Sequence, residues 1–154
     1  MTNELINTER LEIALAEMIA VNPDGTPVYP KGRGFLHCVR IDGKHMWCCL
    51  GVLSDVAVRH GWVPESFRRM TSTIDYAGNV ESFDGETKLL PASVQHAYGL
   101  PSDNPALVTS EGVHVLAATW NDAGTRGSVG NIAPEEDFTA IAEGFRAAFL
   151  RNDI

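Results

Sequence analysis

The sequence is poor in cysteine and in cationic side chains, and it lacks a long apolar run. Only three cysteines stand among 154 residues, an odd number that does not favour a disulfide framework. Twelve Lys and Arg face twenty Asp and Glu, so the formal net charge is -8. Such an acidic chain argues against general nucleic-acid binding, which needs cations that displace counterions. No stretch approaches the ~20 apolar residues of a membrane span.

Two familiar sequence signals are also missing. The first twenty residues mix acidic and apolar side chains, whereas a secretory signal has a cationic start and an apolar run. The chain contains neither GxxxxGK[ST] nor GxGxxG, the glycine patterns of common nucleotide-binding loops. We therefore expect a cytoplasmic protein with free thiols, no membrane segment and no standard nucleotide-binding loop.

What the sequence does contain is the composition of an ordinary globular domain. It is 44% hydrophobic and 21% charged, which is typical of such domains. Its length fits one domain, and no internal repeat or low-complexity segment interrupts it. We predict a single globular domain over residues 1–154, of the α+β class, dominated by helices with a small antiparallel β-sheet or hairpins.

Apolar spacing and turn residues predict the order of the elements. We expect helices over residues 3–21, 46–59, 90–100, 113–122 and 134–151. We expect a strand over 35–41, a turn at 42–44, short hairpins or irregular structure over 70–90, and loops over 22–34, 101–112 and 125–137. The second helix is apolar on nearly every side, which indicates a central, buried position.

A cysteine doublet, Cys48 and Cys49, lies in the first turn of this second predicted helix. Adjacent helical residues point about 100° apart, so the two thiols do not favour one shared metal. Cys49 and His45 are suitable zinc ligands, and His37 and Cys38 stand nearby. However, the spacing matches no compact ligand framework, and His37 and Cys38 face opposite sides of a strand. We predict no metal site and interpret the doublet as small buried hydrophobes.

A cysteine nucleophile is the alternative interpretation of the doublet. It needs a thiol whose pKa is lowered by a helix N-terminus or a nearby cation. Cys48 and Cys49 lie in the first turn of a predicted helix, with His45 close by. Spacing alone names no acid–base partner, because catalytic triads assemble in space. We therefore predict no catalytic residue, and a hydrolase with a cysteine nucleophile stays an alternative.

Positive charge collects just before the doublet. The four cations between residues 31 and 45 are Lys31, Arg33, Arg40 and Lys44. Gly32 and Gly34 alternate with the first two, which frees backbone N–H groups to approach an anion. We predict that this loop binds phosphate or a similar anion. Solvated surface charge that offsets nearby acids is the alternative.

Two tryptophans and a polar pair complete the predicted site. Trp47 and Trp120 offer rings for stacking on a base, although core packing is the alternative for both. Asn121 and Asp122 precede Gly124 and offer hydrogen bonds to a polar ligand. Helix capping and turn formation are the alternative for this pair.

Several motifs occur in an order that is similar to one known family. They are KGRGFL at 31–36, CCLGVLSD at 48–55, LPASVQHAYGL at 90–100, LAATWNDAG at 116–124 and DFTAIAEGF at 137–145. This order resembles a widespread family of small proteins encoded by tailed bacteriophages and prophages. The chain departs from the family pattern at Trp47, Ser54 and Tyr98, where tyrosine, cysteine and tryptophan are common. The resemblance implies no catalytic chemistry, but it implies a role in host takeover or counter-defence.

Together these observations predict a non-enzymatic phage accessory protein of the host cytoplasm, without a cofactor. We expect it to bind and sequester an anionic, nucleotide-like small molecule. The predicted ligand-binding residues are Lys31, Arg33, Arg40, Trp47, Cys48, Trp120, Asn121 and Asp122. An inhibitor that binds a host protein is the other alternative, since a charge of -8 favours steering toward a basic partner. A homodimer is expected because twofold symmetry is the commonest form of association.

Overall fold

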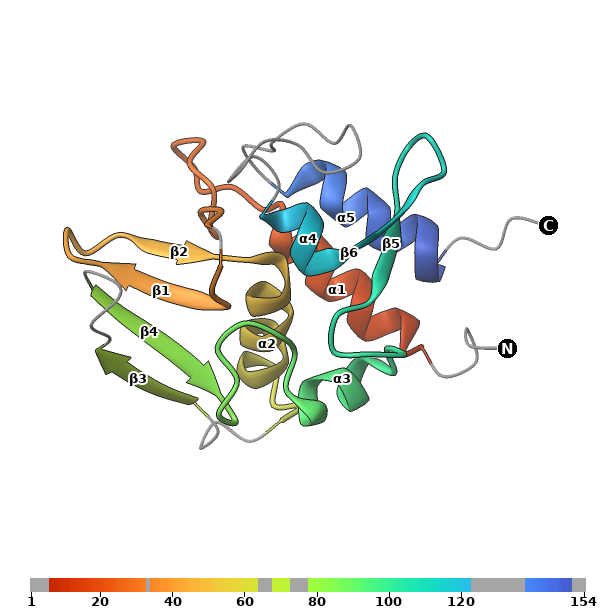
Figure 1. The fold of residues 1–154 in the computed structure, drawn as a ribbon. Helices are drawn as coiled ribbons and strands as arrows, with labels where there is room; N and C mark the ends of the chain where they lie inside the picture. Colours follow the sequence, from red (N-terminus) through yellow and green to blue (C-terminus); the bar gives the residue numbers. More distant parts are fainter. Residues whose placement is uncertain (1–5, 33, 64–67, 73–77, 123–137, 151–154) are drawn as a thin grey trace.

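A computed structural model describes residues 6–32, 34–63, 68–72, 78–122 and 138–150 (Figure 1). The helices are α1 (Thr8–Met18), α2 (Cys49–Arg59), α3 (Ala92–Tyr98), α4 (Ala117–Asn121) and α5 (Thr139–Phe145), which continues as a π-helical turn (Arg146–Leu150). The strands are β1 (His37–Arg40), β2 (His45–Trp47), β3 (Arg68–Ser72), β4 (Gly78–Phe83), β5 (Ala106–Val108) and β6 (His114–Leu116). These elements confirm the predicted α+β class.

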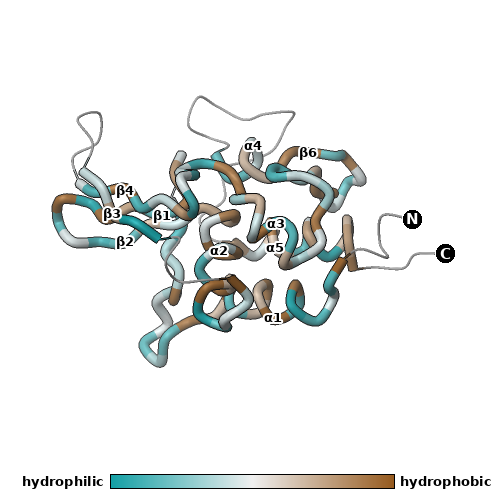
Figure 2. The backbone as a smooth tube through the Cα atoms, turned by 90° about the horizontal axis from the view of Figure 1, so that it is seen from below, coloured by the Kyte–Doolittle hydropathy of each residue, from teal (hydrophilic) through white to brown (hydrophobic). Residues whose placement is uncertain are grey.

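Within the described residues the strands form two antiparallel sheets. The larger sheet has the order β2-β1-β4-β3, and β5 pairs with β6 in the smaller one. In the larger sheet His37 pairs with Trp47 on one side and with Glu81 on the other. This sheet lies at one side of the molecule and the helices gather at the other, with α2 between them (Figures 1 and 2).

Helix α2 is the centre of the fold, as its apolar sequence predicts. Every residue from Cys49 to Val58 is buried. Gly51 allows the backbone of Leu36 to cross this helix closely, because a Cβ at position 51 would stand 1.7 Å from the Leu36 carbonyl oxygen. The helix ends at Arg59 and is followed by His60 and Gly61, where the sequence predicts a stop.

One hydrophobic core joins the elements around α2. It includes residues of α1, α3, α4 and α5 and of the β4 strand, all packed in one cluster with α2. Tyr98 of α3 is fully buried, and its hydroxyl donates to the Leu53 carbonyl at 2.7 Å. No helix in the described parts of the chain is both long and apolar enough to span a membrane.

Two predicted helix starts are wrong, and strand pairing explains both. Residues 45–47 form β2 because they pair with β1, so α2 begins only after Cys48. Residues 114–116 form β6 because they pair with β5, so α4 is confined to Ala117–Asn121. The β5 strand also replaces part of the predicted loop over 101–112.

The other predicted elements agree more closely. The hairpin of β3 and β4 occupies part of the 70–90 segment, and α3 lies within the predicted 90–100 helix. Helix α1 is shorter at both ends than the predicted 3–21 helix. The predicted 125–137 loop and the first residues of the last predicted helix lie outside the described residues.

Candidate functional site

The predicted anion-binding loop is bonded to the end of α4. The Lys31 ammonium donates to the Asn121 carbonyl at 2.8 Å, and the Gly34 amide donates to Asp122 Oδ1 at 3.0 Å. Asn121 Nδ2 in turn donates to the Gly32 carbonyl at 2.8 Å. We call these contacts the Asn121 junction. Each of these loop donors has a protein acceptor, so the junction joins the 31–34 loop to α4.

The start of α2 is joined to the same junction. Asn121 is fully buried, and its Oδ1 accepts from the Cys49 amide at 3.0 Å. The Gly51 amide donates to Cys48 Sγ at 3.3 Å, so Cys48 caps the helix. Amides at a helix start are the usual donors to a bound anion. These two amides bond to the protein instead.

The cysteines are buried, and their thiols are poor nucleophiles. Burial raises the pKa of Cys48 to about 12 and that of Cys49 well above its ordinary value. A thiol of such high pKa carries almost no thiolate near neutral pH. Cys38 is buried too. These observations argue against the alternative of a cysteine nucleophile.

The side chains of the remaining predicted ligand residues do not take part in the Asn121 junction. Arg40 is exposed at the end of β1, 3.9 Å from Asp42. Trp47 is 7% exposed on β2, whereas Trp120 is 4% exposed on α4. Among the described residues, the Trp120 indole Nε1 has no hydrogen-bond partner. Arg33 lies outside the described residues. The structure thus brings Lys31, Cys48, Asn121 and Asp122 together. The Trp47 backbone is bonded to the same loop, since its carbonyl accepts from the Gly32 amide at 2.6 Å, but its ring stacks on His37.

A chain of charged side chains links α2 to the larger sheet. The Arg68 guanidinium on β3 donates to Asp55 Oδ1 at 2.6 Å, and to both Glu81 oxygens at 2.7 and 2.8 Å. Both carboxylates are buried. We call these three residues the ionic network. Buried charges require such pairing, because an unpaired one costs several kcal/mol (about 3–5 when one partner is removed).

A histidine relay extends from this network along the sheet. His37 Nδ1 lies 2.6 Å from Glu81 Oε1, and His37 Nε2 lies 2.8 Å from His45 Nδ1. The two imidazole planes differ by 11°. Parallel rings stacked in van der Waals contact keep their atoms about 3.5 Å apart, so the 2.8 Å contact places both rings nearly in one plane. We call Glu81, His37 and His45 the histidine relay.

The packing around His37 holds the relay in place. Its ring lies flat on the Trp47 indole, with centroids 3.7 Å apart and planes 6° apart. His37 is 4% exposed, whereas His45 is exposed at the edge strand β2. The relay therefore leads from a buried carboxylate to an imidazole that reaches the surface.

Glu81 is ionised at the root of the relay. Burial acts to raise its pKa, but the hydrogen bonds from His37 and Arg68 hold that pKa at about 2. An ionised carboxylate can only accept hydrogen bonds. His37 Nδ1 therefore carries a proton and donates a hydrogen bond to Glu81.

A second group of polar side chains surrounds the other oxygen of Asp55. The Tyr29 hydroxyl and Arg59 Nε donate to Asp55 Oδ2, the latter at 2.8 Å. Arg59 Nη2 also donates to the Tyr29 oxygen at 2.6 Å and to Glu17. Burial acts to raise the pKa of Asp55, but these bonds and Arg68 lower it below its ordinary value. Asp55 is thus ionised, and burial beside it raises the pKa of Tyr29, which stays protonated.

The histidine relay and the second polar group both contribute side chains to one pocket. This pocket lies between α1, the 27–30 loop, β2 and α2. Its lining residues are Glu17, Pro27, Val28, Tyr29, Pro30, His45, Trp47, Asp55 and Arg59. Its volume is about 630 Å³, within the usual range for small-molecule sites. We call it the Tyr29 pocket, and it is the candidate functional site.

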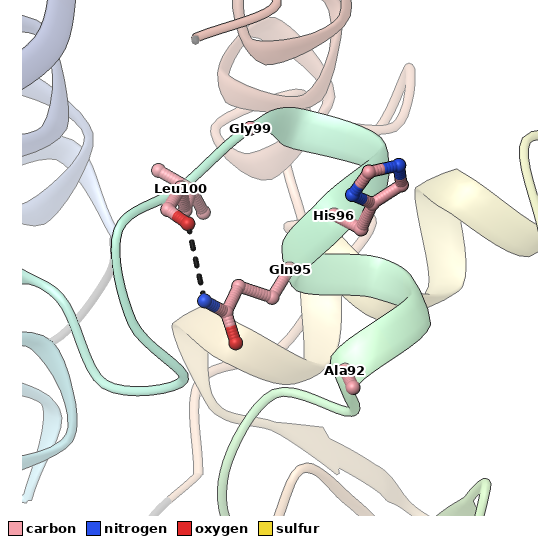
Figure 3. A pocket seen from close by; sticks show the side chains of 5 residues that line it. All are labelled: Ala92, Gln95, His96, Gly99 and Leu100. Atoms are coloured by element: carbon pink, nitrogen blue, oxygen red, sulfur yellow. Dashed lines mark hydrogen bonds between the residues drawn. The ribbon is translucent and has the colours of Figure 1, made fainter. Parts of the chain in front are cut away.

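A second pocket lies at the end of α3 and offers less chemistry. It has a volume of about 470 Å³ and is lined by Ala92, Gln95, His96, Gly99 and Leu100. Figure 3 shows Gln95 directed at the Leu100 carbonyl, to which its Nε2 donates at 3.2 Å, while the His96 ring lies apart from this bond. Its lining contains no ion pair among the described residues.

Sequence reasoning missed most of the Tyr29 pocket. One signal was available, since Asp55 is the one acid within an otherwise apolar helical stretch and a buried acid needs a partner. Tyr29, His37, Arg68 and Glu81 carry no such signal. Their contacts depend on strand pairing between segments that are far apart in the chain.

A metal site is not indicated in this region. Among the described residues, no group of three or more His, Cys, Asp or Glu side chains is arranged to hold a metal ion. His37 and His45 bond to each other, which leaves only one imidazole nitrogen of the pair open.

Comparison with known proteins identifies a family. No curated protein and no solved structure is similar enough to match this chain. The part of the chain that matches a family spans residues 29–143. It includes Tyr29, His45, Asp55 and Arg59 of the pocket, whereas Glu17 precedes it. The chain therefore belongs to the family described as Domain of unknown function (DUF8296).

Proposed function

We propose that the protein binds a small nucleotide-like molecule in the Tyr29 pocket. The observation that carries this proposal is a pair of open hydrogen-bonding atoms on its lining. Arg59 uses Nε and Nη2 in bonds to the protein, and its Nη1 donates to no described residue. His45 is bonded at Nδ1, and its Nε2 bonds to no described residue. A donor and an acceptor are therefore available to a ligand.

Rings near these atoms suit a planar ligand. Trp47 and Tyr29 meet edge to face, with centroids 5.0 Å apart. The exposed imidazole of His45 continues the plane of His37, which is parallel to the Trp47 ring. An imidazole ring can stack on a nucleobase, and His45 offers an exposed one, whereas His37 covers one face of Trp47. The His45 ring supports a ligand that contains a base.

The charges of the pocket favour the nucleoside part of such a ligand. Glu17 and Asp55 are carboxylates, and Arg59 is the one guanidinium on the lining. A carboxylate accepts hydrogen bonds from hydroxyl and amino groups. The single guanidinium can bind one phosphate, but the carboxylates repel a polyphosphate. The proposed site thus differs from the cationic loop that the sequence suggested.

The phage setting rests on the sequence resemblance alone. In that setting, binding in the Tyr29 pocket would withdraw a nucleotide signal from the host. We therefore propose sequestration as the biological consequence of binding, in a host cytoplasm.

Isothermal titration calorimetry tests the proposed function. Titrants are the four common ribonucleosides with their mono- and triphosphates. We expect at least one nucleoside and its monophosphate to bind, and the triphosphate to bind more weakly. Arg59→Ala should weaken monophosphate binding about tenfold, or about 1.4 kcal/mol, while the matched exposed variant Arg40→Ala should have no effect. Absence of binding at millimolar ligand, or tightest binding of a triphosphate that Lys31→Ala abolishes, would refute this assignment.

A further inference from the structure

We propose that His45 is a general base in the Tyr29 pocket, positioned by His37 and Glu81 to activate water against a carboxylic ester, carried as an acyl group on a sugar hydroxyl of the bound nucleoside. This inference rests on the proposed function, because the base acts on a molecule held in that pocket. It also goes further, since pure sequestration needs no base. The relay contains a carboxylate, Glu81, behind its two imidazoles. In this it resembles known nucleophile-activating systems, in which a carboxylate orients an imidazole.

The hydrogen bonds of the relay determine which nitrogen of His45 is basic. Glu81 is a pure acceptor, so the proton of neutral His37 is on Nδ1. The His37 Nε2 atom then has a lone pair and accepts a hydrogen bond from His45 Nδ1 at 2.8 Å. Neutral His45 consequently carries its proton on Nδ1, and its Nε2 has a free lone pair. The ionised Glu81 at the buried end of the relay thus determines the tautomer of His45.

The position of His45 Nε2 makes that lone pair available. His45 is exposed on β2 and lines the Tyr29 pocket. Nε2 bonds to no described residue, so water or a ligand can reach it. A general base needs this combination of a free lone pair and access to the reacting group.

Charged groups of both signs surround His45. The charged or titratable groups on the adjoining elements are Glu17 of α1, Tyr29, His37 of β1, Asp55 and Arg59 of α2, Arg68 of β3 and Glu81 of β4. Three of them are carboxylates and two are guanidinium groups. The Glu81 carboxylate stabilises an imidazolium through His37, as the carboxylate does in other relays.

The proposed step balances as an ester hydrolysis. Water loses a proton to His45 Nε2 while its oxygen bonds to the carbonyl carbon of the ester. The tetrahedral intermediate then collapses, the carbon–oxygen bond to the leaving group breaks, and the alkoxide takes the proton from His45. The open Nη1 of Arg59, on the same pocket, is the donor available to the oxyanion. Acid and alcohol are the products, and His45 returns to its neutral tautomer.

The first test is the tautomer of His45, which needs no ligand. We expect nitrogen-15 NMR of the imidazoles above pH 8 to show a protonated Nδ1 and an unprotonated Nε2 for His45. Exposed His114 serves as the internal comparison, because the Nε2–H tautomer prevails in free imidazole side chains. A protonated Nε2 on His45 would overturn the proposal, whatever the other results.

The second test is hydrolysis of p-nitrophenyl acetate, which releases p-nitrophenolate. We expect the wild type and the matched variant His114→Ala to hydrolyse it about a hundredfold faster than His45→Ala, at the lower end of general-base effects. Glu81→Gln should change the shape of the pH–rate curve, because an amide can donate as well as accept and no longer fixes which nitrogen of His37, and through it of His45, carries the proton. Equal rates in wild type and His45→Ala would overturn the proposal.

Calorimetry separates this failure from failure of the proposed function. If His45→Ala still binds a nucleoside but wild type shows no His45-dependent hydrolysis, the pocket binds without the base. If hydrolysis depends on His45 and no nucleoside binds, the general base stands and the proposed ligand class is wrong. Circular dichroism of each variant confirms that the exposed substitution at position 45 leaves the fold intact.

Discussion

At the scale of single residues, the Asn121 side chain connects segments of the fold that are far apart in the chain. Its amide contacts the Gly32 carbonyl and the Cys49 amide, so it joins the 31–34 loop, α2 and α4. The sequence indicated a helix end here, and a cap was one of the two interpretations. The structure adds that the cap belongs to a different helix, α2, which is distant in the chain.

Replacement of Asn121 tests this role. Asn121→Ala removes both bonds from a fully buried site and leaves the Cys49 amide and the Gly32 carbonyl without their partner. We expect the free energy of unfolding to fall by about 3 kcal/mol, measured by urea denaturation. The control is Asn79→Ala at an exposed position of β4, which should cost about 0.5 kcal/mol or less. Equal effects of the two substitutions would contradict the role of Asn121.

Thiol reactivity is the second prediction at this scale. Burial raises the pKa of Cys48 and Cys49, so both should resist iodoacetamide in the folded protein. We expect labelling at pH 8 to be about a hundredfold slower than in denaturant, as followed by mass spectrometry. Rapid labelling of Cys48 in the folded protein would restore the cysteine-nucleophile alternative.

At the scale of elements, the ionic network attaches the larger sheet to α2. Arg68 bonds both to Asp55 of the helix and to Glu81 of the sheet. Bidentate contacts of this kind define orientation as well as energy. The network thus positions β1 and β2, which carry His37 and His45, relative to Asp55 of α2 on the lining of the Tyr29 pocket.

The pH dependence of stability reports on this attachment. The pKa of Glu81 falls from an ordinary value of 4.5 to about 2 on folding. Its lowered pKa therefore stabilises the folded state above about pH 4.5, and this contribution is lost as the pH falls toward 2. We expect Glu81→Gln to lower the free energy of unfolding by about 3 kcal/mol at pH 6, and by much less at pH 3. Urea denaturation at the two pH values measures this, and a constant difference would contradict it.

Secondary structure could be predicted where a single segment determines it. The continuous apolar stretch of α2 indicated its burial, and Gly99 indicated the end of α3, where it adopts φ 72°. The strands β2 and β6 have three residues each, too few to show a period of two. Their neighbours across the sheet, rather than their own sequence, place them in strands.

The candidate site could be predicted only in part for the same reason. Lys31, Cys48, Asn121 and Asp122 do meet, as the sequence interpretation required, but they meet in the Asn121 junction. The Tyr29 pocket draws Glu17, His45 and Arg59 from three different elements. No local pattern contains that information, because the pocket exists only after the sheet and α2 have packed.

At the scale of the whole molecule, one core joins the helical side to α2. Such a core predicts cooperative unfolding. We expect circular dichroism and tryptophan fluorescence to give coincident thermal transitions. Trp47 reports from the larger sheet and Trp120 from α4, so Trp47→Phe and Trp120→Phe should show the same Tm by fluorescence as by circular dichroism. Two separated transitions would show that the sheet unfolds independently.

The acidic character of the molecule is consistent with the chosen pocket. A chain of charge -8 repels polyanions at long range, and the pocket lining itself has more carboxylates than guanidinium groups. An uncharged or singly charged nucleoside derivative avoids most of this repulsion. The whole-molecule charge and the local charge thus point to the same class of ligand.

The location of ligand binding tests the central claim most directly. Nitrogen-15 correlation spectra recorded during titration with the best-binding nucleoside would map the contact residue by residue. We expect the largest shifts at Tyr29, His45 and Arg59, and only small shifts at Gly32, Gly34 and Asp122. Largest shifts at those last three residues, or no shifts at millimolar nucleoside, would contradict the assignment of the Tyr29 pocket as the binding site.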